Sequence, residues 1–205
     1  MDFSNLPLYT INESNKVGER IYKTEIADLY YIDTIVHSDE RGFYREISVV
    51  TDLNKVIGQE FQIKQLNHAN SKKNVVRGMH AEDWNKLVTV THGVCLCVLA
   101  DIRPDSKTFL KTQYFLLGFG LDKALPGSFF ITRGIANSMC IIDESVDYFY
   151  AVDKLDRDRD KTGAIAISLF DPDLNIQWPI NKDQMIISNR DQDSITLREK
   201  FPEKF

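Results

Sequence analysis

Short apolar, β-rich runs recur along the chain with a period of two, and clusters of turn residues separate them. Residues 86–91 and 94–101 form two such runs, with Gly93 between them, which is typical of a hairpin. The other runs are 27–36, 42–50, 61–67, 108–117, 128–132, 138–142, 146–152 and 164–169. Many short strands at close spacing predict an all-β sandwich or barrel.

Helical patterning is sparse. Residues 51–57 predict one short helix with Thr51 as its N-cap, and the part from residue 181 onward predicts another turn or two. We expect a single domain over residues 1–205, with extensions at about 1–25 and 192–205 that either wrap a partner subunit or fray. The run of alternating charges at 153–161 is typical of a solvated loop.

Charge and apolar content limit the classes of function. The 25 Lys and Arg against 30 Asp and Glu leave a net charge of −5, which disfavours a dedicated nucleic-acid binder. We expect no membrane association, because no apolar run approaches the roughly 18 residues that span a bilayer and the first residues lack a signal-peptide pattern. Three cysteines, with Cys95 and Cys97 on one strand face, predict buried free thiols and a cytoplasmic protein.

Polar side chains are densest between residues 64 and 86. Arg77 and Lys86 flank His80 there, which suggests an anionic ligand beside a proton-transfer group. The alternative is a structural histidine within an exposed charged loop. For any single residue of this cluster, the residues alone favour that structural alternative.

Other common site chemistries have little support in the pattern. The four histidines, His37, His68, His80 and His92, form no close pair with a trailing glutamate, so we expect no metal site. The Gly118-Phe119-Gly120 turn lacks a third glycine, and the chain contains no Gly-x-Ser-x-Gly motif.

Several motifs of the polar cluster and its flanks occur in a distinctive order. They are Asp39-Glu40-Arg41-Gly42, Arg77-Gly78-Met79-His80, Lys86-Leu87-Val88 and Trp178-Pro179. With its motifs in this order, the chain resembles the dTDP-4-dehydrorhamnose 3,5-epimerase family (RmlC type), and the resemblance extends from about residue 37 to residue 191. The resemblance implies a cupin-like jelly roll with a few short helices, forming a homodimer without metal or other cofactor. It also implies a nucleotide-linked 4-keto-6-deoxy sugar, expected to be the dTDP form, and a place in deoxysugar and cell-surface polysaccharide biosynthesis.

The resemblance also implies a role for particular residues. His80 would be the catalytic base, Asp191 its orienting carboxylate, Tyr150 the acid on the other face of the sugar and Lys86 the partner of the enolate oxygen. The expected substrate-binding residues are Arg41, Glu46, Gln65, Asn67, Arg77 and Asn137.

These residue types suit the chemistry. Inverting a carbon beside a ketone requires loss of a proton and its return on the opposite face, and a neutral histidine is a good base near neutral pH. For Tyr150 alone, a core or rim position in an aromatic strand is the strong alternative.

The chain departs from the family pattern around the sugar and the base. Glu82 stands where the family has glutamine, Asn137 replaces a histidine, and Leu155-Asp156 replace an aromatic pair. Three alternatives follow: a single-site epimerase acting on another nucleotide sugar, a non-catalytic nucleotide-sugar-binding jelly roll, and a metal-dependent cupin isomerase or dioxygenase.

Overall fold

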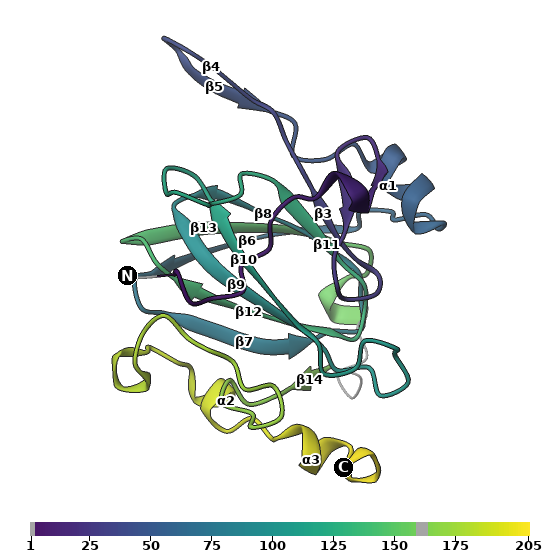
Figure 1. The fold of residues 1–205 in the computed structure, drawn as a ribbon, viewed down its shortest axis with the longest axis vertical. Helices are drawn as coiled ribbons and strands as arrows, with labels where there is room; N and C mark the ends of the chain where they lie inside the picture. The colour runs from purple at the N-terminus through teal and green to yellow at the C-terminus, as the bar shows by residue number, and fades with distance from the viewer. Residues whose placement is uncertain (1–2, 159–163) are drawn as a thin grey trace.

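Two antiparallel sheets face each other in a computed structural model that describes residues 3–158 and 164–205 (Figure 1). The seven-stranded sheet has the order β1-β2-β3-β11-β8-β13-β6. Its strands are β1 (Lys16–Gly18), β2 (Ile21–Lys23), β3 (Leu29–Ile32), β6 (Gln65–Lys72), β8 (Lys86–His92), β11 (Ser128–Ile131) and β13 (Ser145–Val152). β1 and β2 come from the N-terminal segment, where the sequence pattern is weak.

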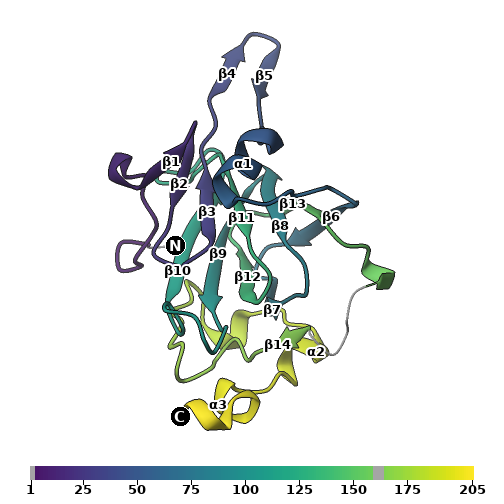
Figure 2. The ribbon, with the colours of Figure 1, turned by 90° about the vertical axis from the view of Figure 1, so that its right-hand side faces the viewer.

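The five-stranded sheet has the order β10-β9-β12-β7-β14. Its strands are β7 (Val76–Ala81), β9 (Val94–Asp101), β10 (Thr112–Gly118), β12 (Ile135–Ile141) and β14 (Ile165–Ala166). A separate hairpin of β4 (Val36–Asp39) and β5 (Gly42–Arg45) projects away from the sandwich as an arm (Figures 1 and 2). This all-β sandwich with few helices is the predicted cupin-like jelly roll.

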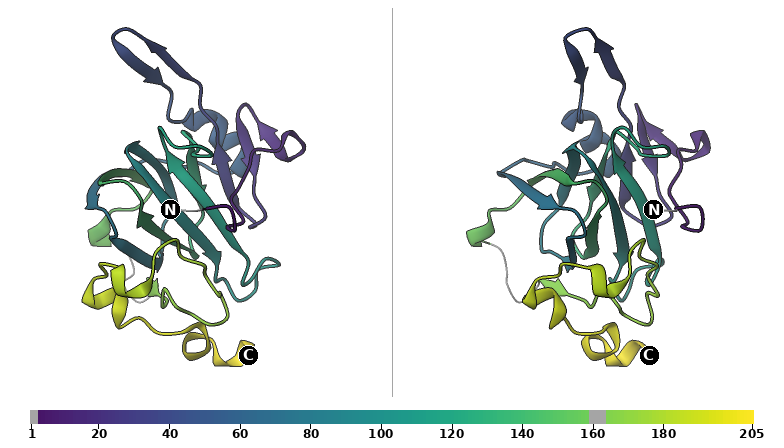
Figure 3. Two further views of the ribbon diagram at one scale, coloured as in Figure 1. Left: turned by 60° about the vertical axis from the view of Figure 1, so that its left-hand side comes forward. Right: turned by 90° about the vertical axis from the view of Figure 1, so that its left-hand side faces the viewer.

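Helices are short. They are α1 (Val50–Ile57), α2 (Asn189–Gln192) and α3 (Leu197–Lys200), with 3-10 turns at Glu13–Asn15, Asp156–Asp158, Lys182–Gln184 and Pro202–Lys204. The C-terminal segment with α2 and α3 lies along the β7 and β14 side of the five-stranded sheet (labelled in Figure 1; yellow in Figure 3). Within the described residues, no helix is long and apolar enough to cross a bilayer.

The main core fills the space between the sheets. Val88 and Val90 of β8 meet Cys97 and Leu99 of β9 there. A second core covers the other face of the five-stranded sheet, where the C-terminal segment packs through Leu174, Trp178 and Leu197. All residues of β9 are buried, and the strand has apolar partners on both faces. This explains its unbroken apolar run from Val94 to Ala100. Cys95, Cys97 and Cys140 are buried free thiols, as predicted.

The predicted hairpin between residues 86–91 and 94–101 is wrong. β8 pairs with β11 and β13, whereas β9 pairs with β10 and β12, so the chain crosses from one sheet to the other at Gly93. Gly93 has a φ of +75°, and a Cβ atom at this position would lie 2.2 Å from the backbone oxygen of Ser145. A sheet-to-sheet corner and a hairpin therefore share the same glycine signal.

The predicted cap of the first helix is also wrong. α1 begins at Val50, with Val49 as the N-cap, because the backbone oxygen of Val49 accepts the N–H groups of Asp52 and Leu53. Residues 46–50 are therefore not part of a strand, although the pattern predicts a strand over 42–50. In the charged run, residues 156–158 are exposed, and residues 159–161 lie outside the described part of the chain.

Candidate active site

A cavity of about 480 Å³ opens between the two sheets, with walls from β6, β8 and β13 on one side and β7 and β12 on the other. It contains eight of the ten predicted site residues: His80, Tyr150, Asp191, Lys86, Gln65, Asn67, Arg77 and Asn137. The fold thus brings together segments from residue 65 to residue 191.

His80 and Asp191 form a hydrogen-bonded pair in this cavity. Nε2 of His80 lies 2.7 Å from Oδ1 of Asp191, and the two side chains are 23% and 5% exposed. A carboxylate acceptor favours the tautomer that carries its proton on Nε2, which leaves Nδ1 as the basic nitrogen.

The backbone around the pair fixes its position. β7 runs between β12 and β14, so His80 has Asn137 on one side and Ala166 on the other. Asp191 lies in the first turn of α2, where Ser188 is the N-cap, and its Oδ2 lies 3.4 Å from the Gly78 backbone N–H. Gly78 has a φ of +126°, and a Cβ atom there would lie 2.6 Å from Cβ of Ser138. Only glycine allows β7 to approach β12 this closely beside His80.

Lys86 and Tyr150 come from the facing sheet. Tyr150 lies between Asn67 of β6 and Val88 of β8 in the strand register. The ammonium of Lys86 lies 5.7 Å from the centre of the Tyr150 ring, within the range of a cation–π interaction. Both side chains line the cavity.

Amide and guanidinium groups complete the wall near β6. Nε2 of Gln65 donates to Oδ1 of Asn67 at 2.7 Å, and Nε of Arg77 donates to the Ser71 hydroxyl at 3.0 Å. Nδ2 of Asn67 is buried without a hydrogen-bond partner among the described residues. Such an amide is costly unless a ligand or water binds it.

Arg41 and Glu46 lie outside this cavity. Arg41 is exposed at the tip of the β4–β5 arm, where it pairs with Asp39 at 2.5 Å. Glu46 follows β5, and its carboxylate is 3.8 Å from the guanidinium of Arg20. Within one chain, the structure therefore does not bring these two residues to His80.

The cavity also contains residues that the sequence reasoning did not assign. Tyr148, Arg190 and Glu82 line it. Tyr148 shares a strand face with Tyr150 because the two are separated by two positions, and Arg190 adjoins Asp191. Period-two spacing could have identified Tyr148.

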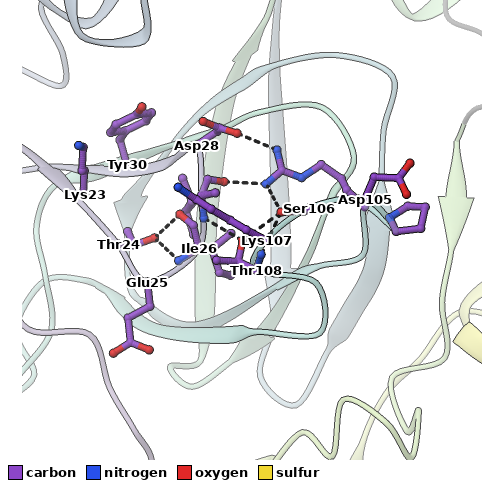
Figure 4. Close-up of a pocket in the computed structure, with 14 residues that line it drawn as sticks. Lys23, Thr24, Glu25, Ile26, Asp28, Tyr30, Asp105, Ser106, Lys107 and Thr108 are labelled. Carbon is purple, nitrogen blue, oxygen red and sulfur yellow. Dashed lines mark hydrogen bonds and ion pairs between the residues drawn. The ribbon is translucent and has the colours of Figure 1, made fainter. Parts of the chain in front are cut away.

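A larger groove, of about 770 Å³, lies elsewhere, between residues 23–30 and 103–108 (Figure 4). Its hydrogen bonds centre on Arg103 and on the buried carboxylate of Asp101. Arg103 donates to Asp101, Asp28 and the backbone oxygen of Ala27, and the hydroxyls of Ser106 and Thr108 donate to Asp101. We interpret this network as support for the turn after β9.

The jelly roll and the His80–Asp191 pair facing Lys86 and Tyr150 define a sandwich protein equipped for acid–base chemistry on a small ligand. A model of the dTDP-4-dehydrorhamnose 3,5-epimerase family matches residues 23–199. The chain belongs to this family, and it is an isomerase.

Individual relatives agree with this assignment. The dTDP-4-dehydrorhamnose 3,5-epimerase of Escherichia coli (strain K12) is 30% identical over 183 residues, covering 87% of this chain and 95% of that enzyme. The dTDP-4-dehydrorhamnose 3-epimerase of Streptomyces niveus is 27% identical, covering 88% of this chain and 84% of that enzyme. Among solved structures, the dTDP-6-deoxy-D-glucose-3,5-epimerase of Legionella pneumophila Philadelphia 1 in complex with dTDP-4-keto-L-rhamnose matches with a TM-score of 0.78. It is 27% identical, covering 90% of this chain and 96% of that chain.

Proposed function

We propose that this enzyme inverts C3 and C5 of a dTDP-linked 4-keto-6-deoxyhexose in deoxysugar biosynthesis. The observation that carries the proposal is the 2.7 Å pair of His80 and Asp191 in a cavity whose facing wall carries Tyr150 and Lys86. No metal or other cofactor has a role in this proposal.

Proton removal falls to His80. The carbons beside the C4 ketone are acidic enough for general base catalysis, because the negative charge moves to the ketone oxygen as the proton leaves. Asp191 holds the imidazole in one tautomer and stabilises the imidazolium that forms. Its buried carboxylate has no other charged partner among the hydrogen bonds of the described residues.

The enolate oxygen needs a positive group at the point where charge develops. Lys86 is the cation on the wall opposite His80, at the start of β8, where strand pairing to Ile131 and Val152 fixes its backbone. A prearranged cation in a partly enclosed cavity stabilises the enolate more strongly than it would in water.

Reprotonation must occur on the other face of the sugar ring. Tyr150 lies on the seven-stranded sheet and His80 on the five-stranded sheet, so a ring bound between the sheets has one group on each face. This arrangement favours epimerisation over exchange with retention, and it distinguishes the proposal from a binding module.

Substrate binding uses the remaining polar wall. The buried Nδ2 of Asn67, paired through its oxygen with Gln65, is a donor for a sugar or phosphate oxygen. Arg77, exposed on β7 at the cavity, supplies positive charge for the diphosphate. Asn137 contributes from β12.

A homodimer would bring Arg41 and Glu46 to a nucleotide. The β4–β5 arm carries Phe43 and Tyr44, which are 58% and 65% exposed, so it presents apolar surface that a second copy could cover. We propose that the arm of one protomer completes the cavity of its partner. Light scattering should give a dimer mass, and a monomer that turns over substrate at full rate would contradict this arrangement.

We also propose a cytoplasmic location. All three cysteines are buried free thiols, a state that a reducing compartment maintains.

The test is turnover of dTDP-4-keto-6-deoxy-D-glucose, followed by NMR, with the UDP and GDP forms as comparisons. We expect the dTDP sugar to give a product inverted at both C3 and C5. A product inverted only at C3 would instead support the single-site activity in the name of the Streptomyces niveus relative. No reaction with any nucleotide form would contradict the proposal.

A further inference from the structure

A hydrogen bond between two residues of the cavity lining crosses the sandwich. Nδ2 of Asn137, on β12, lies 3.0 Å from the hydroxyl oxygen of Tyr148, on β13 of the facing sheet. Both residues line the cavity. This bond joins the two walls that carry His80 and Tyr150.

The pair interrupts an apolar surface. The residues of β12 that share a face with Asn137 are Ile135, Met139 and Ile141, and all three belong to the core between the sheets. Tyr148 is itself a core residue with 5% exposure. A buried polar pair is costly relative to apolar side chains unless its hydrogen bonds are made, so packing alone does not explain its presence.

The pair has spare hydrogen-bonding capacity. An asparagine amide has two N–H donors and a carbonyl acceptor, and a tyrosine hydroxyl can donate as well as accept. Among the described residues, the bond between them is the only one that either side chain makes. The Tyr148 proton and the Asn137 oxygen therefore remain for a ligand. Burial raises the pKa of Tyr148, with a smaller contribution from the nearby Cys97 thiol, so the hydroxyl keeps its proton and can donate.

The position of the pair indicates which part of the substrate it meets. Asn137 is the direct cross-strand neighbour of His80, and the rings of Tyr148 and Tyr150 lie 6.0 Å apart between their centres. Side chains of directly paired residues are neighbours, with Cβ atoms about 5 Å apart. A 4-keto-6-deoxyhexose linked through C1 has only two free hydroxyls, on C2 and C3. C3 is one of the two carbons from which His80 removes a proton in the proposed reaction.

Resting on the proposed function, we infer that the Asn137–Tyr148 pair is a specificity element that binds the C3 hydroxyl of the sugar. The pair binds that hydroxyl while His80 removes protons from C3 and C5. It also selects sugars that carry a polar group at C3. A site built to hydrogen-bond a hydroxyl rejects analogues that lack it, because the buried groups are then left unpaired.

The test combines Tyr148→Phe with substrate analogues. The rate of deuterium exchange at C5, as kcat/KM, is measured by NMR for dTDP-4-keto-6-deoxyglucose and for its 2-deoxy and 3-deoxy analogues. Tyr148→Phe should slow exchange about tenfold in the parent and in the 2-deoxy analogue, and leave the 3-deoxy analogue unchanged. Asn137→Leu should give the same pattern.

Tyr114→Phe is the matched control. Tyr114 is equally buried, and its hydroxyl accepts a hydrogen bond from the Gln177 backbone N–H outside the cavity. Thermal melting of both variants checks the fold, and Tyr114→Phe should leave the exchange rates unchanged.

The inference is overturned if Tyr148→Phe slows the 3-deoxy analogue as much as the parent, if it spares only the 2-deoxy analogue, or if it has no effect on the parent. Failure of the proposed function has a different signature, because the wild-type protein would then exchange neither C3 nor C5 in the parent sugar.

Discussion

His80 and Tyr150 line one cavity from opposite sheets of the sandwich: His80 lies on β7 of the five-stranded sheet and Tyr150 on β13 of the seven-stranded sheet. A sugar ring bound between the sheets would meet a base on one face and a hydroxyl acid on the other. Inversion of a carbon requires this two-sided arrangement, whereas retention requires only one group.

Asp191→Asn should lower kcat by about a hundredfold or more, because an amide can donate to the imidazole and favour the wrong tautomer. The fold should persist, since the substitution is nearly isosteric. Steady-state kinetics and a thermal melt measure both effects. Asp193→Asn, two residues along and exposed, is the control. An unchanged rate would remove Asp191 from the catalytic pair.

Tyr150→Phe should abolish the C5-inverted product while deuterium exchange at C3 continues. His80 remains able to remove a proton, but the acid on the opposite face is gone. NMR of the product in D₂O resolves the two positions. Tyr30→Phe is the control, because Tyr30 is partly buried and lines the larger groove, not this cavity; it should behave as wild type. Full turnover by the Tyr150 variant would show that Tyr150 is not the acid and has a purely structural role.

Asp101→Asn should destabilise the fold by roughly 3 kcal/mol at neutral pH without changing substrate specificity. Burial raises the pKa of Asp101, but hydrogen bonds from Arg103, Ser106 and Thr108 outweigh it, and the net pKa is lowered. The carboxylate therefore stabilises the fold fully above its unfolded pKa of about 4, and this contribution is lost as pH falls through the lower folded pKa. Urea unfolding of the wild type and the variant should converge in acid. A gap that is independent of pH would contradict this account.

Dialysis against EDTA should leave turnover unchanged, because side chains supply the base and the enolate partner. Metal analysis of the active protein accompanies the assay. Loss of activity that zinc or iron restores would instead favour the hypothesis of a metal-dependent cupin isomerase or dioxygenase.

The sequence predicts the sandwich well because period-two patterning reports directly which faces are buried. It fails at Gly93, where a corner between sheets and a hairpin require the same backbone freedom. It also misses β1 and β2, which are three residues each and too short for a periodic signal.

For the site, the motifs predict the residues that share the cavity, yet local patterning cannot reveal that β12 and β13 place Asn137 against Tyr148. That contact depends on how two sheets pack across the core. The separation of Arg41 and Glu46 from the cavity likewise follows from the projecting arm, which the pattern over 42–50 presents as an ordinary strand.

The most direct test of the central claim is deuterium incorporation during turnover of dTDP-4-keto-6-deoxy-D-glucose in D₂O, counted by mass spectrometry for the wild type and His80→Asn. The account predicts two deuteriums per wild-type product. It predicts a rate lower by about 10²–10⁴-fold for His80→Asn, which loses the general base. His68→Asn, which removes an exposed histidine paired with Asp147 on a different surface, should match the wild type. Undiminished exchange by folded His80→Asn would contradict the account.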